Sequence, residues 1–189
     1  MDIDELISIV TLKKLEDNKF EGQNYKTVWG RIFGGQVLSQ SLHAAYQTVP
    51  ENRIAHSMHA YFILPGDLNE PVIYEVDNIR NGGSFTTRRV VAFQKGRAIF
   101  NMAASFQKDE EGFDHQIQMP NVLSPDLLLT DFEQAEKFKE ELAERYQIFL
   151  AAHPKVFDFK PVGTNIFLRK ENALPINHCW FRLKDKIDM

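Results

Sequence analysis

Ile32-Phe33-Gly34-Gly35-Gln36-Val37-Leu38-Ser39-Gln40-Ser41-Leu42-His43-Ala44-Ala45 and, after Pro50, His56-Ser57-Met58-His59-Ala60-Tyr61-Phe62 form the stretch that decides the fold. Two glycines open a helix that is rich in glycine, serine and alanine, predicted over Gly34 to Thr48. Because its side chains are small, this helix can lie very close to a sheet. A long strand follows it. The stretch therefore predicts one buried helix wrapped by strands.

Long strands follow this helix at short intervals. We predict them over Arg53–Leu64, Pro71–Arg80, Ser84–Gln94 and Arg97–Gln107. Asn81-Gly82-Gly83 and Lys95-Gly96 are typical of hairpin turns, because asparagine and glycine accept positive φ. Strands of this length in antiparallel series make a strongly curved sheet, and the helix is the element that fills its concave side. The predicted class is α+β, with Leu38, Leu42, Ala45 and Val49 on the helix face toward the sheet.

Further elements flank this unit. We expect a helix over Asp4–Glu16 capped by Asp2 or Asp4, a strand over Lys19–Gln23, a loop over Lys108–Pro125, a helix over Leu127–Ala152, and strands over Val156–Arg169 and Asn177–Leu183. Two strands alone bury little surface, since an isolated hairpin is marginal in water. They either add to the first sheet or begin a second domain.

Composition narrows the class of function. The 189 residues hold 22 basic and 26 acidic side chains, a net charge of −4, which does not favour nucleic-acid binding. Cys179 is alone, so a disulfide framework is excluded and a reducing, cytoplasmic compartment is expected. The acidic start Met1–Glu5 is unlike a signal peptide. No apolar run approaches the ~20 residues that span a bilayer, so we expect no membrane segment.

Four blocks of sequence resemble one family. They are Phe33-Gly34-Gly35-Gln36-Val37-Leu38-Ser39-Gln40-Ser41-Leu42, His56-Ser57-Met58-His59-Ala60-Tyr61-Phe62-Ile63-Leu64-Pro65-Gly66-Asp67, Gly83-Ser84-Phe85-Thr86-Thr87-Arg88-Arg89-Val90 and Ala103-Ala104-Ser105-Phe106-Gln107. In order and spacing they are similar to the acyl-CoA thioesterase II family. The resemblance implies a double-hotdog fold and hydrolysis of fatty acyl-CoA to free acid and CoA by an activated water. It implies no cofactor and no metal.

The resemblance also divides the chain. It implies an N-terminal helix (1–18), a first hotdog (19–107), a loop and helical linker (108–155) and the first strands of a second, truncated hotdog (156–189). The family's catalytic Asp, Ser or Thr, and Gln correspond to positions beyond Met189, so they cannot be placed here. The alternative function is a non-catalytic module that binds acyl-CoA or a partner subunit. Uncovered strand edges predict a homo-oligomer.

The candidate site residues come from the motifs. Gly34, Gly35 and Gln36 stand at a helix N-terminus, where backbone N–H groups can contact a substrate carbonyl, although the glycines can equally serve only close packing. His56 is the catalytic candidate, because regular alternation places it with Met58 and Phe62 and opposite His59; a buried structural histidine is the other interpretation.

Ser84 and Arg88 complete the predicted substrate-binding set. Ser84, Thr86 and Arg88 share one face of a strand, and Arg88 or the neighbouring Arg89 suits the phosphates of CoA; the alternative is a structural ion pair. Pro65-Gly66-Asp67-Leu68-Asn69-Glu70-Pro71 resembles a segment of hotdog enoyl-CoA hydratases, but no histidine follows it. We therefore interpret it as a turn in which Asp67 bonds its own backbone. Nucleophile-elbow, P-loop and Gly-x-Gly-x-x-Gly patterns are absent from the sequence.

Overall fold

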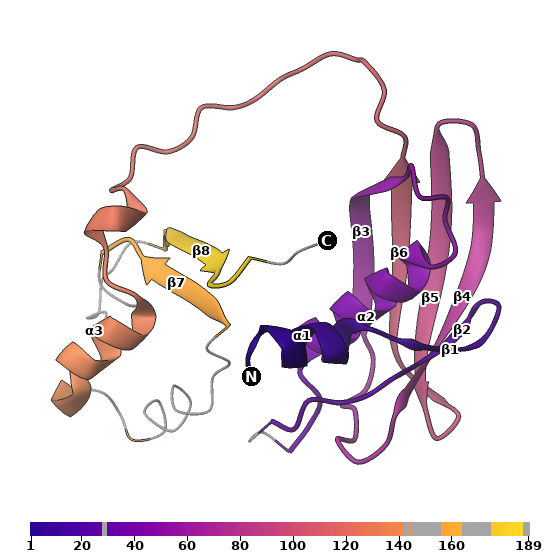
Figure 1. Ribbon diagram of the computed structural model, residues 1–189, viewed down its shortest axis with the longest axis horizontal. Coiled ribbons are helices and arrows are strands. Elements are labelled where there is room, and N and C mark those ends of the chain that lie inside the picture. Colours follow the sequence, from indigo (N-terminus) through magenta and orange to yellow (C-terminus); the bar gives the residue numbers. More distant parts are fainter. Residues whose placement is uncertain (28–29, 142–143, 145–155, 164–174, 187–189) are drawn as a thin grey trace. The chain divides into compact units, whose positions relative to one another are not determined.

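A computed structural model describes residues 1–27, 30–141, 144, 156–163 and 175–186 (Figure 1). It divides into two units: residues 7–113, and residues 1–6 together with 114–189. The elements are α1 (Ile3–Val10), β1 (Lys13–Glu16), β2 (Lys19–Gly22), α2 (Gly34–Tyr46), β3 (Ile54–Phe62), β4 (Val72–Asn81), β5 (Phe85–Gln94), β6 (Arg97–Gln107), the short 3-10 helix η1 (Pro125–Leu127), α3 (Asp131–Lys137), the short 3-10 helix η2 (Lys139–Glu141), β7 (Phe157–Pro161) and β8 (Cys179–Leu183).

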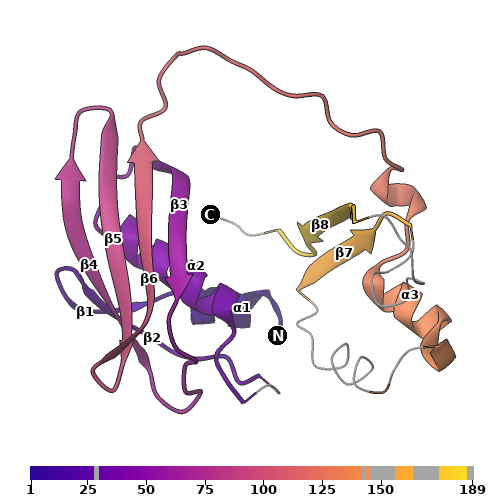
Figure 2. The ribbon, with the colours of Figure 1, turned by 180° about the vertical axis from the view of Figure 1, so that it is seen from behind.

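The first unit contains a six-stranded sheet in the order β1-β2-β4-β5-β6-β3. Every neighbouring pair is antiparallel, as the sequence predicts. Strands β4, β5 and β6 form a meander, while β3 returns to the outside of β6 and becomes one edge of the sheet. Strand β1 is the other edge. Figure 2 shows this sheet from behind, with β3 beside β6.

Helix α2 lies against one face of this sheet, here called the inner face, and contacts β2, β4, β5 and β6. Burial alternates along the strands because every second side chain points toward the helix. The fully buried apolar side chains of the inner face include Val72, Tyr74, Val90, Ala92, Phe100, Met102 and Phe106. A curved antiparallel sheet around a central helix is the hotdog arrangement that the sequence predicts.

The predicted inner face of α2 needs correction. Leu38 and Leu42 are only partly buried at its flank, and so is Val49 beyond its end, whereas Ala45 is fully buried as expected. The residues that α2 buries are Gln36, Val37, Gln40, Ser41, Ala44 and Ala45. The close approach to the sheet leaves room for small side chains and for glutamines that find polar partners there. Leucine spacing alone therefore indicated the flank of the buried stripe and not its centre.

The two predicted hairpin turns differ in their backbone. Lys95 (φ 49°) and Gly96 (φ 70°) adopt the left-handed conformations expected of a tight turn. Gly82 and Gly83 do not have positive φ, contrary to prediction. Gly82 is instead required by a close approach, since a Cβ there would lie 2.6 Å from the carbonyl oxygen of Phe85.

The chain between α1 and β2 also departs from prediction. The Asp2 carboxylate caps α1 by accepting from the Glu5 N–H (2.9 Å), but the helix ends at Val10 instead of Glu16. Lys13–Glu16 forms β1, which pairs antiparallel with β2. A ladder of hydrogen bonds and a cross-strand ion pair between Lys13 and Glu21 (3.7 Å) outweigh the helical pattern there.

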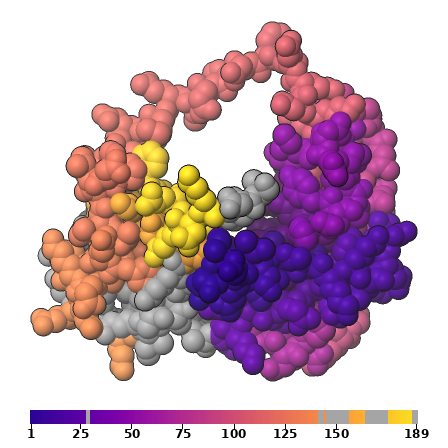
Figure 3. Space-filling model, viewed as in Figure 1, coloured from indigo at the N-terminus to yellow at the C-terminus, as the bar shows by residue number. Residues whose placement is uncertain are grey.

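The segment after β6 forms no helix or strand through residue 124, as predicted for Lys108–Pro125, although η1 begins at Pro125. Figure 3 shows it as a thin extended run of residues, and the Phe113 side chain is fully exposed. The predicted helix over Leu127–Ala152 is wrong in its first part. Helix α3 begins only after Thr130, which forms a capping box with Glu133, and it ends at Lys137. Residues 142–143 and 145–152 lie outside the described residues.

Strands β7 and β8 pair antiparallel in a separate two-stranded sheet. Among the described residues they pair with no strand of the first sheet. Phe157, Phe159 and Phe181 share one face of this hairpin, and the rings of Phe159 and Phe181 stack at 6.2 Å. The remainder of the predicted strand, residues 164–169, lies outside the described residues.

Two buried arginines attach the β4–β5 hairpin to the rest of the first unit. Arg88 is 1% exposed. Its five N–H groups donate to Thr48 Oγ1 (2.8 Å) and the Thr48 carbonyl (2.7 Å), the Arg80 and Thr87 carbonyls (3.0 Å each) and Asn81 Oδ1 (2.7 Å). Arg53 donates to the carbonyls of Gly82, Gly83 and Ser84. Burial lowers the pKa of Arg88 from its ordinary value.

We predict that Arg88→Ala lowers the free energy of unfolding by about 3 kcal/mol, because it removes charged donors and leaves buried carbonyls unpaired. The control is Arg89→Ala on the next residue, whose exposed ion pair with Asp77 (2.8 Å) is worth about 0.5 kcal/mol. Urea denaturation measures both variants. Equal losses would contradict a structural role for Arg88.

Candidate functional site

The N-terminus of α2 is the polar feature that the fold leaves open. Phe33 is the residue before the helix, with an extended backbone (φ −68°, ψ 127°), and no side chain caps the helix among the described residues. The Phe33 carbonyl accepts from the N–H groups of Gln36 (3.0 Å) and Val37 (3.4 Å). The N–H groups of Gly34 and Gly35 have no acceptor within the helix, and the helix dipole adds partial positive charge there. This end can therefore bind an anionic or carbonyl oxygen.

Two aromatic rings border this helix end. A Cβ on Gly34 would lie 2.8 Å from the ring of Phe62, and one on Gly35 would lie 2.4 Å from the ring of Phe33. The two rings therefore lie almost against the helix backbone at these glycines. The Phe62 ring also packs against Phe100 at 4.9 Å. Phe33 and Phe62 remain 62% and 63% exposed, so an apolar rim stands next to the uncapped N–H groups.

Gln36 points into the protein and not toward this rim. Its Oε1 accepts from the Tyr25 N–H (2.9 Å), and its Nε2 lies within donor distance of the Gln23 carbonyl (3.1 Å), Asn24 Oδ1 (3.0 Å) and Gln40 Oε1 (3.3 Å). Gln36 is 7% exposed. Its side chain holds residues 23–25 against the first turn of α2, so it supports the candidate site from behind.

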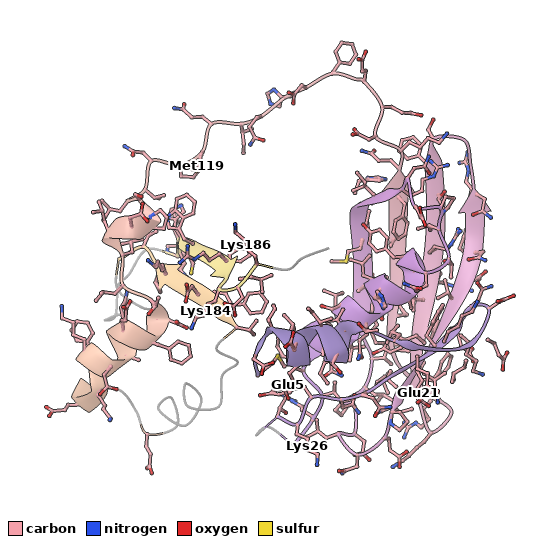
Figure 4. The ribbon with its side chains drawn as sticks, viewed as in Figure 1. Glu5, Glu21, Lys26, Met119, Lys184 and Lys186 are labelled. Atoms are coloured by element: carbon pink, nitrogen blue, oxygen red, sulfur yellow. The ribbon has the colours of Figure 1, made fainter. Side chains whose placement is uncertain are left out.

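Gln40 continues this polar network into the core. Its Oε1 accepts from the Tyr74 hydroxyl (2.6 Å), while its Nε2 donates to the carbonyls of Ile9 (2.6 Å) and Gln23 (2.9 Å). Burial raises the pKa of Tyr74, which keeps its hydroxyl protonated as a donor. The network joins α1, the residue after β2, and β4 to α2; Figure 4 draws the side chains around these elements as sticks.

His56 lies on the outer face of the sheet, contrary to prediction. A β-bulge between Ala55 and Ser57 shifts the register, so Met58 and Phe62 pair with inner-face residues of β6 while His56 does not share their face. Its Nε2 lies 2.9 Å from Ser105 Oγ, and its ring packs against Phe85 at 5.7 Å. His56 is exposed and lies within hydrogen-bonding distance of Ser105. It therefore neither shares a face with Met58 and Phe62 nor is a buried structural histidine.

The same bulge places His59 on the outer face. His59 pairs with Ala103, whose side chain points away from α2, and its ring lies 4.9 Å from that of Tyr61. The prediction that His56 and His59 face opposite sides of the sheet is therefore wrong. It rested on regular alternation, which one extra residue interrupts.

Ser84 and Arg88 lie at the opposite end of α2 from Gly34. Arg88 bonds Thr48, just after the helix ends, and α2 is about 20 Å long. All five Arg88 donors are directed to protein oxygens, which leaves none for a phosphate. Ser84 Oγ bonds Glu110 (3.3 Å), and Arg89 pairs with Asp77 on the surface. The structure thus brings Gly34 and Gly35 together with Gln36, but not with Ser84, Arg88 or His56.

Asp67 forms the turn that the sequence predicts. Its Oδ1 accepts from the backbone N–H of Asn69 (3.0 Å), and its Oδ2 pairs with Lys95 (3.0 Å). The Asn69 hydrogen bond and then Lys95 lower the pKa of this carboxyl. Both carboxylate oxygens of Asp67 therefore serve structural contacts of this loop. In the part of the chain that the structure describes, no group of three or more His, Cys, Asp and Glu side chains could hold a metal ion.

Comparison with known proteins agrees with this fold. Residues 24–107 match the acyl-CoA thioesterase N-terminal domain. Acyl-CoA thioesterase 2 of Haemophilus influenzae is 41% identical over 142 residues, which are 75% of this chain and 50% of that protein. The crystal structure of acyl-CoA thioesterase II TesB2 from Mycobacterium marinum is 34% identical, with a TM-score of 0.72 over 96% of this chain and 61% of that chain.

A hot dog fold protein of unknown function from Alicyclobacillus acidocaldarius has a TM-score of 0.71 at 18% identity, covering 95% of this chain and 62% of that one, and it supports the fold alone. The molecule is therefore a hotdog-fold protein. The chain belongs to the acyl-CoA thioesterase II family. It spans about half the length of the curated relatives it matches. No helix within the described segments combines the length and apolar character needed to cross a bilayer.

Sequence reasoning missed most of the polar network behind the site. Gln40 follows Gln36 by four residues, so both point from one side of the helix, and Gly22 lies so close that a Cβ there would be 2.8 Å from the Gln40 side chain. Two glutamines at this spacing on the more buried side of a helix were the available signal. No local sequence signal pointed to Tyr74, because its partner Gln40 is 34 residues away in the sequence.

We predict that Gln36→Ala lowers the free energy of unfolding by about 2 kcal/mol, because it leaves the Tyr25 N–H and other buried groups unpaired. Gln47→Ala is the matched control at the end of the same helix, where the side chain is exposed and lies within hydrogen-bonding distance of His43 (3.2 Å). That control should stay within about 0.5 kcal/mol of the wild type. Chemical denaturation of both variants measures the difference; similar losses would show that Gln36 does not support the site.

Proposed function

We propose that this protein acts on fatty acyl-CoA, hydrolysing it to free fatty acid and CoA by means of an activated water. Family membership supports the substrate class, and the uncapped N-terminus of α2 beside an apolar rim is the observation that carries the proposal. The N–H groups of Gly34 and Gly35 would bind the thioester carbonyl oxygen, and Phe33 and Phe62 would contact the acyl chain.

The proposed reaction places negative charge at this helix end. Water attacks the carbonyl carbon, the oxygen becomes an oxyanion, and the C–S bond then breaks to release CoA as the thiol. Fixed backbone donors favour the oxyanion over the neutral carbonyl, since they are aimed where charge develops. Glycine at both positions keeps the approach free of side-chain atoms.

The residue that activates the water is not assigned to the described residues. The resemblance places the family's catalytic Asp, Ser or Thr, and Gln beyond Met189, and the curated relatives are longer than this chain. We propose that residues 19–107 are a first hotdog that forms one wall of the substrate cleft. Residues 156–189 would be the first strands of a second hotdog, and their separate sheet supports this division.

A second function, binding without hydrolysis, is favoured because the chain spans only about half the length of its curated relatives. The chain could bind acyl-CoA, or a partner subunit, without hydrolysing the thioester. The same helix N-terminus would serve binding, because it recognises an oxygen without any proton transfer. Saturable binding of acyl-CoA without thiol release would support this function over hydrolysis.

We predict that hydrolysis, measured with a thiol reagent as CoA thiol released from octanoyl-CoA, depends on the backbone N–H donor at Gly34. Gly34→Pro removes one N–H group at the first helical position, where proline is tolerated, and turnover should fall about 100-fold. Gly34→Ala is the matched control: it adds a Cβ beside Phe62 in the same way but keeps the N–H group. Equal turnover of the two variants would contradict a role for this donor.

We also propose a homo-oligomer in which β3 is covered. This edge strand is nine residues long, and its exposed side chains include Met58, Tyr61 and Phe62. A long apolar edge with unpaired backbone groups favours pairing with another chain. A cytoplasmic location is proposed from the lone Cys179; it predicts recovery in the cytosolic fraction.

For the oligomer, we predict that light scattering at micromolar concentration gives at least twice the mass of one chain. Met58→Lys on β3 should shift the protein toward the monomer, because a buried lysine opposes the contact. Leu15→Lys on β1 places the same charge on the other edge strand and should leave the mass unchanged. A monomeric wild type would contradict the proposal.

A further inference from the structure

The loop between β3 and β4 is held by a side-chain amide that the proposed function does not use. Asn24 lies just after β2, and its Nδ2 donates toward the carbonyls of Asp67 (3.3 Å), Leu68 (3.4 Å) and Glu70. The contact to Glu70 is the shortest of the three. Since an amide has two N–H groups, the carbonyls of Asp67 and Leu68 share one donor.

A second amide holds the same loop from β5. Gln94 is 6% exposed, and its Nε2 donates to the carbonyls of Asp67 (2.9 Å) and Glu70 (2.6 Å). Its Oε1 accepts from the Asp67 N–H (2.8 Å). The carbonyls of Asp67 and Glu70 therefore each receive donors from both Asn24 and Gln94. This pair of side chains, Asn24 and Gln94, is called the amide clamp below.

The amide clamp is joined to the first turn of α2. Asn24 Oδ1 accepts from Gln36 Nε2 (3.0 Å), so one side chain contacts the helix with its oxygen and the loop with its nitrogen. The Ile32 N–H donates to the Gly66 carbonyl (3.1 Å), which adds a second link between the chain before α2 and this loop. Phe62, which borders Gly34, immediately precedes the loop.

We propose that Asn24 is a positioning residue: its amide fixes the β3–β4 loop against the first turn of α2 and thereby sets the distance between Phe62 and the N–H groups of Gly34 and Gly35. This inference rests on the proposed function. The role requires an amide, because the oxygen must accept from Gln36 while the nitrogen donates to carbonyls. Neither alanine nor a carboxylate satisfies both sides.

The test is Asn24→Asp, which keeps the shape but turns an oxygen toward carbonyl oxygens. The pKa of the introduced carboxyl should be raised, because ionisation is opposed by those oxygens, and its protonated form can donate again. The nearby charged groups are Asp67, Glu70 and Lys95, which pair with one another on the surface, and Glu21 on β2. On α2 the facing side chain is the neutral Gln36.

We expect Asn24→Asp to bind octanoyl-CoA about tenfold more weakly than the wild type at about pH 7.5. At about pH 5.5 it should come within about threefold of the wild type, as the carboxyl protonates. Asn24→Ala should be weak at both pH values. Asn78→Asp is the matched control, because Asn78 is exposed and donates to Asn18 (3.2 Å) on the surface, and it should bind as the wild type does.

Hydrogen exchange provides a readout that is independent of acyl-CoA. Amides of residues 66–70 should exchange faster in Asn24→Asp at about pH 7.5 and recover protection, relative to the wild type at matched pH, at about pH 5.5.

If the wild type binds octanoyl-CoA and Asn24→Asp binds it equally well at both pH values, the inference is overturned and the proposed function stands. If the wild type does not bind, the proposed function fails, and unchanged exchange would then overturn the inference as well. If Asn24→Asp does not fold at neutral pH, Asn24→Ala carries the test: wild-type binding and exchange would overturn it.

Discussion

The structure depends on burying a helix whose inner side is partly polar. Helix α2 presents Gln36, Gln40 and Ser41 to the sheet, and burying such groups without partners would cost more than the apolar contacts gain. Gln36 and Gln40 are satisfied by backbone groups and by Tyr74, which are drawn from α1, the end of β2 and β4. Just beyond the other end of the helix, Arg88 likewise provides hydrogen-bond donors to backbone carbonyls, including that of Thr48. Ser41 Oγ is an exception, with no partner among the described residues.

This constraint explains where a ligand can reach the helix. The inner side of α2 is occupied by packing and the chain just beyond its C-terminal end by the Arg88 contacts, whereas its N-terminal N–H groups lie beside exposed aromatic rings. The glutamines hold the approach to that end in place without occupying it. The structural function of the helix and its proposed ligand-binding function are thus separated along its axis, and the proposed chemistry uses the N-terminal end, which lies outside the buried network.

The sequence predicted the fold well because the deciding signals were local. Small residues in α2 and turn residues at Lys95-Gly96 act through their immediate neighbours, and the strand boundaries followed from them. The contacts of Arg88 could not be read from local spacing, because its partner Thr48 lies 40 residues away in the sequence. The role of Asn24 could not be predicted for the same reason, since its contacts with the β3–β4 loop lie more than 40 residues away in the sequence. Motifs identified the end of the helix but not the side chains that hold it.

The β-bulge in β3 has a consequence for comparing relatives. Residues before and after Ala55–Ser57 are out of phase, so a template of strict alternation assigns one of the two segments to the wrong surface. A relative that lost the extra residue would carry its first histidine toward the helix without any substitution. Insertions and deletions at this point therefore exchange side chains between interior and exterior, and an alignment that places a gap elsewhere in the strand conceals that exchange.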